Sequence, residues 1–404
     1  MLSLVKMKEM RDKIVGLICK FKDLTSFSIA TLVTNAIGGI FWLYMASLLG
    51  TEGYGEISYL ISIGILSSTI SLAGMSNIII VYGAKNIRIQ STIFLIGLIS
   101  SGITASIIFF FVEKDITVSL YIIGFVIFTL ITADLIGRKL FTKYFKVIII
   151  QKIILVILAI TFYYLIGLQG ILLGFGLSFL VFSFIIYQSF KEMKIDFSIF
   201  KGRYKFAINS FLLDVSNAFN GSLDKIIIAP LLGFSLLGNY QLGLQFISLA
   251  YLIPGMLFTY ILTHDSSGNS TKFVKRILIV ISIVITIITI TLSPIFVPIL
   301  FPKFLESIVV IQIMSIGIIP SAIVSTYISK YLGSTNSKIV IIGSSIFLGI
   351  QIPSIIILGS MYGLNGVAVS GVISAFIHMT YFVIIDRFQD EAESAASTQK
   401  NINY

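Results

Sequence analysis

The sequence predicts an all-α polytopic membrane protein with twelve transmembrane helices arranged as two six-helix lobes. Its 404 residues are 57% hydrophobic and only 11% charged, whereas soluble domains carry about 25% charged residues. Apolar runs of roughly 20 residues recur along the chain, and each is long enough to cross the hydrocarbon core of a bilayer. The two halves of the sequence also resemble each other. The short alternating segments of a membrane β-barrel are absent from the pattern.

Hydropathy places the twelve spans in order along the chain. We expect them near 25–49, 56–82, 89–112, 116–137, 145–166, 168–190, 205–231, 239–262, 274–300, 305–332, 338–359 and 363–386.

The basic residues follow the predicted spans in a regular alternation. With the N-terminus inside, all but four of the 28 Lys and Arg fall in cytoplasmic segments. Lys114 and Lys303 fall outside, and Lys152 and Lys225 lie within spans. This is the distribution of a multi-pass protein of the cell (inner or plasma) membrane with both termini cytoplasmic. The formal charge of +10 therefore reflects topology, and we expect no nucleic-acid partner.

These boundaries divide the chain into five regions. Residues 1–24 form a basic amphipathic N-terminal segment that we expect on an anionic membrane surface, with a flexible basic leader as the alternative. An N-lobe (25–190), a cytoplasmic linker (191–204), a C-lobe (205–388) and a polar, loose cytoplasmic tail (389–404) follow. The single cysteine, Cys19, excludes an internal disulfide, and no metal-type cluster or P-loop is present.

Glycine-containing segments recur at corresponding helix boundaries of the two halves. "LLGTEGYGEISYL" (48–60) parallels "LLGFSLLGNYQLGLQF" (231–246), with Gly50 matching Gly233. "GLQGILLGFGLSF" (167–179) parallels "GLNGVAVSGVISA" (363–375), with Gly167 matching Gly363. Six helices per half give both copies the same direction through the membrane, so the repeat is parallel.

Span 205–231 carries polar residues at helical spacing. Ser210, Asp214, Asn217, Gly221 and Asp224 follow one another at intervals of four and three residues, so they share one face. Because intramembrane charges face a cavity or a partner, we interpret Asp214, Asn217 and Asp224 as an ion- or proton-coupling site. The coupling ion would be Na⁺ or H⁺. The alternative is a packing stripe whose Asp bonds a neighbouring helix.

Other polar residues in the spans are candidates for a substrate cavity. Lys152 is a candidate phosphate ligand, or it snorkels to the interface. His378 joins a proton relay or is a packed hydrogen bonder. Asp134 is expected to pair with Arg138 one turn later, whereas Asp224 and Lys225, as sequence neighbours, are not expected to face one another. The remaining cavity candidates are Lys225, Gln151, Thr31, Thr34, Asn35, Asn220, Gln241 and Gln245; for Thr31, Thr34 and Asn35 close packing is the alternative, and for Gln241 and Gln245 interhelical hydrogen bonding.

Three segments resemble the polysaccharide and O-antigen flippases of the Wzx type. They are "ASLLGTEGYGEISYL", "SLDKIIIAPLLGFSLLGNYQLG" (222–243) and "GLNGVAVSGVISA". That family belongs to the multidrug/oligosaccharidyl-lipid/polysaccharide (MOP) exporter superfamily. The resemblance implies two lobes around a central cavity that opens alternately to each side. Such cavities often carry several arginines, and no arginine lies in the interior of a predicted span here, which leaves the phosphate ligands open.

The resemblance implies a flippase that moves a polyprenyl-(pyro)phosphate-linked oligosaccharide from the cytoplasmic to the outer leaflet, driven by an ion or proton gradient. The implied partners are this substrate, membrane lipids and other polysaccharide-assembly proteins, with the chain as a monomer and without a bound cofactor. A multidrug or cationic-metabolite exporter is the alternative. A membrane-embedded glycan polymerase or glycosyltransferase is a second alternative, but every external loop is short and no catalytic constellation is evident, so we expect a secondary transporter and no enzyme.

Overall fold

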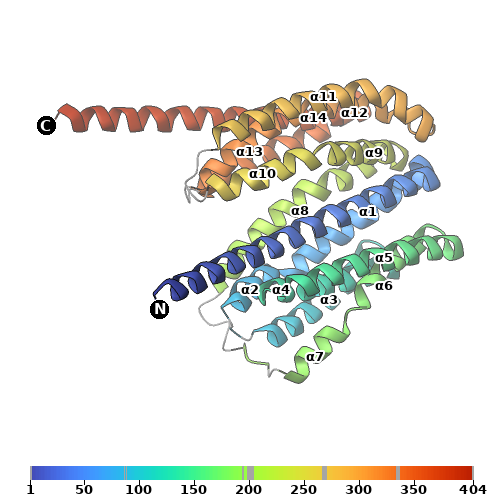
Figure 1. Ribbon diagram of the computed structural model, residues 1–404. Helices are drawn as coiled ribbons and strands as arrows, with labels where there is room; N and C mark the ends of the chain where they lie inside the picture. Colours follow the sequence, from blue (N-terminus) through green and yellow to red (C-terminus); the bar gives the residue numbers. More distant parts are fainter. Residues whose placement is uncertain are drawn as a thin grey trace. The chain divides into compact units, whose positions relative to one another are not determined.

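The computed structural model describes residues 2–85, 87, 89–192, 195–197, 204–265, 271–333 and 337–402. Within helices, the backbone alone is described at 2–33, 192, 204–206, 213, 216, 217, 220, 263, 337 and 390–402. The helices are α1 (Leu2–Leu72), α2 (Met75–Ala84), α3 (Gln90–Phe111), α4 (Ile116–Gly137), α5 (Phe141–Ile166), α6 (Leu168–Leu180), α7 (Phe184–Glu192), α8 (Tyr204–Leu232), α9 (Phe234–Ala250), α10 (Leu252–Asp265), α11 (Lys272–Leu300), α12 (Ser307–Ile316), α13 (Ile318–Gly333) and α14 (Ser337–Ile402) (Figure 1).

The all-helical membrane fold is confirmed, since the described residues contain helices and no strand. Within the described ranges, eight stretches of helix are long and apolar enough to span a membrane, and the pair α9–α10, bent by 48°, makes a ninth if it is one span. Each of the twelve predicted spans is mainly helical, and four of them are broken by short non-helical stretches at 73–74, 181–183, 251 and 317. Two pairs of spans are merged into α1 and α14, which are interrupted by non-helical backbone at Gly50 and Gly363.

The chain beyond residue 388 is not loose as expected, because α14 continues to Ile402. This stretch lacks Gly and Pro and contains three alanines, so nothing in its local sequence stops the helix. The predicted amphipathic segment 1–24 is helical from Leu2 and continuous with α1. Its side chains lie outside the described part of the chain.

The glycine repeat predicted from sequence has a structural counterpart. Gly50 and Gly233 adopt positive φ angles of 70° and 86° between consecutive helices, and Gly167 and Gly363 adopt 75° and 60°. Positive φ is strained for residues with a Cβ atom. A Cβ at Gly170 would lie 2.1 Å from the Phe162 carbonyl oxygen, and one at the matching Gly366 would lie 1.9 Å from that of Leu358.

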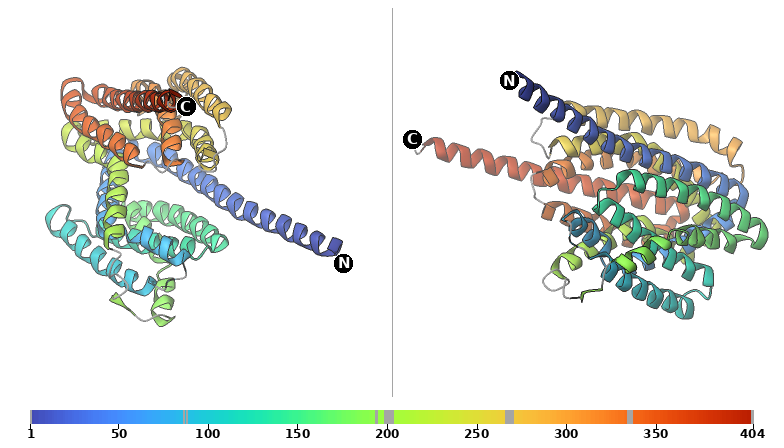
Figure 2. Two further views of the ribbon diagram at one scale, coloured as in Figure 1. Left: turned by 90° about the vertical axis from the view of Figure 1, so that its left-hand side faces the viewer. Right: turned by 60° about the horizontal axis from the view of Figure 1, so that its bottom comes forward.

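The described residues form two compact units. Unit 1 comprises 1–42 and 60–218. Within it α4 is the central helix and contacts α2, α3, α5 and α6 (Figure 2). Its core contains Ile79, Phe94, Val126 and Leu130, all at most 1% exposed.

Unit 2 comprises 43–59 and 219–404. Its central helix is α12, which contacts α9, α11, α13 and α14. Residues 43–59, which belong to the first half of the sequence, therefore pack with the helices of the second half. The lobe boundary predicted at 191–204 falls mostly outside the described residues and stays a prediction.

Segment 43–59 packs on α9 through two reciprocal glycine contacts. A Cβ at Gly55 would lie 1.9 Å from the Phe234 carbonyl oxygen, and a Cβ at Gly238 would lie 1.9 Å from that of Thr51. The sequence offset that matches Gly50 to Gly233 also matches Gly55 to Gly238 and Thr51 to Phe234. Each copy of the repeat thus places its glycine on the carbonyl of the other copy. The Ser235 hydroxyl donates to the Thr51 hydroxyl at the same crossing, 3.1 Å apart.

At the end of α10, Asp265 ties three elements of unit 2 together. Its carboxylate accepts hydrogen bonds from Lys275 of α11 at 2.7 Å, from Ser329 of α13 at 2.7 Å, and from Thr271. Partial burial raises the pKa of Asp265, but the hydrogen bonds from Lys275, Thr271 and Ser329 and the lysine charge lower it more strongly. The pKa of Asp265 therefore lies below its ordinary value.

We predict that Gly238→Ala destabilises the protein, because the new methyl group overlaps the Thr51 carbonyl. The expected loss is about 1–3 kcal/mol, the usual effect of overpacking. It is measured as the thermal unfolding midpoint of the full chain in detergent. Gly349→Ala in α14 is the matched control, since nothing lies within 4 Å of its Cβ position; equal midpoints for the two variants would contradict the close crossing.

We predict that Asp265→Asn lowers the unfolding midpoint at neutral pH by about 2–4 °C, the effect of about 1 kcal/mol for a partly exposed ion pair. Because the folded pKa is depressed, the carboxylate contributes this stability above the unfolded pKa of about 3.9. The contribution disappears as pH falls through the lowered folded value. Midpoints of variant and wild type should therefore converge in acid, and the exposed Glu52→Gln is the control. A difference that grows in acid would contradict this account.

Candidate functional site

Unit 1 contains a pocket of about 380 Å³ between α1, α4, α5 and α6, within the range of small-molecule sites. Its lining residues are polar or aromatic apart from one isoleucine. They are Thr34, Asn35, Phe125, Phe128, Thr129, Thr132, Tyr144, Ile148, Gln151, Lys152 and Phe179.

Helix α5 supplies one wall of the pocket. Tyr144, Ile148 and Gln151 follow at intervals of four and three residues and share a face, with Lys152 beside them. The helix is held by α6, because a Cβ at Gly174 would lie 2.5 Å from the Ala159 backbone nitrogen.

The Gln151 amide is already engaged in packing. It is 1% exposed, and its Nε2 donates to the Ser178 hydroxyl of α6 at 3.0 Å. The Ser178 hydroxyl in turn donates to the Phe175 carbonyl at 2.7 Å. Gln151 therefore holds α5 to α6 in the wall of the pocket.

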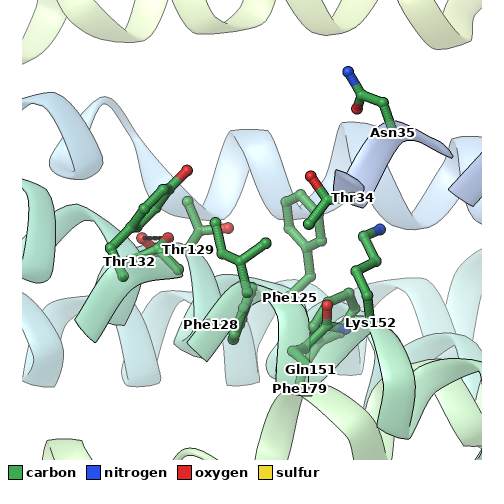
Figure 3. Close-up of a pocket in the computed structure, with 11 residues that line it drawn as sticks. Thr34, Asn35, Phe125, Phe128, Thr129, Thr132, Gln151, Lys152 and Phe179 are labelled. Carbon is green, nitrogen blue, oxygen red and sulfur yellow. Dashed lines mark hydrogen bonds between the residues drawn. The ribbon is translucent and has the colours of Figure 1, made fainter. Parts of the chain in front are cut away.

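Lys152 is the single charged residue of the lining. Its side chain extends from α5 towards Thr34 of α1, while the amide of Asn35 points away from the lysine (Figure 3). Within the described part of the chain Lys152 forms no ion pair. Because the described lining residues include no acidic side chain, their net formal charge is +1.

Aromatic rings form the wall opposite α1. The Phe179 ring lies 5.7 Å from Phe125 in an edge-to-face arrangement and 5.4 Å from Phe128. Two hydroxyl residues of α4, Thr129 and Thr132, lie beside these rings (Figure 3). The Thr132 hydroxyl donates to the Thr129 carbonyl at 2.9 Å. Faces of this kind suit the apolar side of a sugar ring, and the hydroxyls suit its polar rim.

Asp214 of α8 lies elsewhere in unit 1, against the first turn of α2. Its two carboxylate oxygens accept from the Asn77 amide at 3.1 and 3.2 Å, and Ser76 provides a further side-chain hydrogen bond. Helix α2 begins there because Ala73 and Gly74 adopt positive φ angles of 45° and 76° and interrupt the span. The carboxylate therefore sits at the positive end of a helix dipole.

Asp224 and Lys225 of α8 belong to unit 2, and the expectation that they do not face one another is wrong. The Lys225 ammonium lies 3.4 Å from Asp224 Oδ1 and donates to the Gly221 carbonyl at 2.5 Å. Asp224 also accepts from the Tyr240 hydroxyl at 2.8 Å. The flexible lysine stem folds back along the helix, which Cβ spacing alone does not capture. Both charges are thereby neutralised within the protein.

The remaining candidates are distributed over unit 2. The His378 ring lies 5.4 Å from the Phe347 ring and 5.2 Å from the Phe382 ring in tilted arrangements, and its Nε2 is buried without a hydrogen-bond partner among the described residues. Gln241 lies beside Tyr54, and Gln245 is half-buried one turn further along α9. The side chains of Thr31, Asn217 and Asn220 lie outside the described part of the chain.

The structure thus brings together four of the predicted cavity residues, Thr34, Asn35, Gln151 and Lys152. It also confirms the predicted pair of Arg138 and Asp134, whose Nε and Oδ1 atoms are 2.8 Å apart. The lining residues that sequence reasoning missed lie on α4, α5 and α6. For the residues of α4, the spacing of Thr129 and Thr132, three residues apart on one face of the helix, is the signal that could have revealed them.

Searches among protein-family models and among curated proteins return no match. Solved structures, in contrast, match over most of the chain. The lipid II flippase MurJ in an inward closed conformation aligns with a TM-score of 0.74 and 18% identity over 89% of this chain and 87% of that chain.

Two transporters of the MOP superfamily match as well. An inward-facing multidrug resistance MATE family transporter gives a TM-score of 0.71 and 13% identity over 93% of this chain and 99% of that chain. A MOP superfamily transporter from Pyrococcus furiosus, described as having a binding pocket of reverse polarity, gives a TM-score of 0.57 and 15% identity over 92% of this chain and 96% of that chain. At these identities the likeness establishes the fold: this chain has the fold of MOP-superfamily transporters.

Proposed function

We propose that this protein is a flippase that moves a polyprenyl-(pyro)phosphate-linked oligosaccharide from the cytoplasmic to the outer leaflet of the cell membrane. The observation that carries the proposal is the pocket of unit 1, where Lys152 is the single charge among aromatic, hydroxyl and amide side chains. A lysine presents a compact positive charge to a phosphate, and the flanking rings and hydroxyls suit the adjoining sugar.

The same lining argues against the alternative of a cationic-drug exporter. Such a substrate needs an acidic or purely aromatic cavity, and here an ammonium would meet the lysine charge in a medium of low dielectric constant. A polymerase or glycosyltransferase is not supported either, because no acid–base pair lines the pocket.

Asp214 is the residue we propose to couple transport to an ion or proton gradient, with Na⁺ or H⁺ as the ion. Its carboxylate faces Asn77 and Ser76 and no cationic side chain among the described residues. A proton or a monovalent cation would compensate a charge that two neutral partners leave in place. Asp224 is less suited to this role because Lys225 and Tyr240 already satisfy it.

We predict that Lys152→Met reduces flipping of a lipid-linked oligosaccharide by about tenfold or more, because it removes a charge-assisted contact of about 1.5–3 kcal/mol. Lys152→Arg should retain part of the activity. The measurement is translocation of a fluorescent lipid-linked glycan in proteoliposomes. Lys146→Met, an exposed lysine on the same helix outside the pocket, is the matched control. Unimpaired flipping by Lys152→Met would refute the assignment of this pocket.

We predict that Asp214→Asn uncouples transport from the gradient. If one proton is coupled, a gradient of one pH unit shifts the leaflet distribution of the substrate by up to about tenfold, and a tenfold sodium gradient acts equally if sodium is coupled. The variant should show neither response. Asn77→Ala, which removes the hydrogen bond and keeps the carboxylate, is the control and should remain responsive. A full gradient response in Asp214→Asn would remove the coupling role.

A further inference from the structure

The charge of the unit 1 pocket carries a further inference about the substrate, which rests on the proposed function. Two other described cations, Arg138 at the C-terminal end of α4 and Lys225 within α8, are already neutralised. Arg138 pairs with Asp134 at 2.8 Å, and Lys225 pairs with Asp224 at 3.4 Å. Among the described residues that line the pocket, Lys152 is the one cation, and no helix contributes a second.

The other polar groups of the lining carry no charge. They are hydroxyls and amides, among them Thr34, Thr129, Thr132 and Tyr144. Such groups solvate an anion, but they do not neutralise it. The formal charge that a bound headgroup meets from the described lining residues is therefore +1.

The two common linkages between a lipid and a glycan differ in charge at neutral pH. A single phosphate joined to both carries one negative charge, whereas a pyrophosphate joined to both carries two. An uncompensated charge is strongly unfavourable in a site surrounded by hydrocarbon. One lysine matches the single phosphate and leaves one charge of the pyrophosphate without a counterion.

We infer that the preferred substrate is linked to its lipid through a single phosphate. The geometry of Lys152, whose side chain extends from α5 towards α1 (Figure 3), places this phosphate at the ammonium group. The first sugar then lies against Phe125, Phe128 and Phe179.

The test compares two synthetic lipids that share one prenyl chain and one glycan and differ only in a phosphate or a pyrophosphate linkage. Translocation of each is measured with the full-length protein in proteoliposomes. A chelator is present, because a divalent cation on the pyrophosphate would supply the missing positive charge. We expect the monophosphate lipid to be translocated about tenfold or more faster.

A gain-of-charge variant makes the test independent of a loss of activity. Thr132→Lys adds a second cation on α4, in the lining of the same pocket, and should shift the preference towards the pyrophosphate lipid. Thr132→Gln adds a side chain without the charge and should leave the wild-type preference unchanged. Equal preference in wild type and Thr132→Lys would overturn the charge-matching account.

The outcomes separate this inference from the proposed function. Faster translocation of the pyrophosphate lipid by the wild-type protein would overturn the single-phosphate linkage and leave the flippase function standing. Translocation of neither anionic lipid, together with transport of a cationic amphiphile, would overturn the proposed function and the inference with it.

Discussion

A hydrocarbon solvent offers no hydrogen bonds, so every polar group within a span must find its partner inside the chain. The serines and threonines of this protein follow the rule locally: Ser58, Ser68 and Ser282 each donate to the carbonyl four residues earlier at 2.6–2.8 Å. The rule also holds at a helix defect. Pro294 removes the donor to the Ile290 carbonyl, and the Gln312 amide donates to it from α12 at 3.3 Å. The need to pair polar groups within the chain therefore accounts for many of the side-chain contacts in the spans.

Against that background, the charged groups of the spans fall into two kinds. Asp224, Lys225 and Tyr240 form a closed set in which each charge has its partner, so they have little capacity left for a ligand. Neither Lys152 nor Asp214 forms an ion pair among the described residues, and the hydrogen-bond partners of Asp214, Asn77 and Ser76, are neutral. A membrane protein retains such groups where an ion or substrate completes them, and this contrast is the physical basis for assigning one to the headgroup and the other to the gradient.

Much of the fold and one ion pair were predictable from residues that lie close in sequence. Hydropathy located the spans, the paired glycines located the repeat, and the four-residue spacing located the Asp134–Arg138 pair, because each depends on helix geometry alone. Contacts between distant helices were not predictable. Asn77 is 137 residues from Asp214, and periodicity shows which face of a helix is polar but not which helix lies opposite. The Thr129–Thr132 wall was missed for the same reason, since its meaning depends on Lys152 being across the pocket.

The packing of residues 43–59 with α9 through Gly55 and Gly238 bears on how the chain is made. Residues 43–59 are synthesised and inserted into the membrane before α9 is synthesised. Their glycine-containing face therefore has no packing partner while the intervening helices are inserted. Assembly of unit 2 is therefore a post-insertional event, completed only after the second half is synthesised. The first half expressed alone would carry an orphaned segment, and co-expression of two separate halves would have to reunite it with α9 by diffusion in the bilayer.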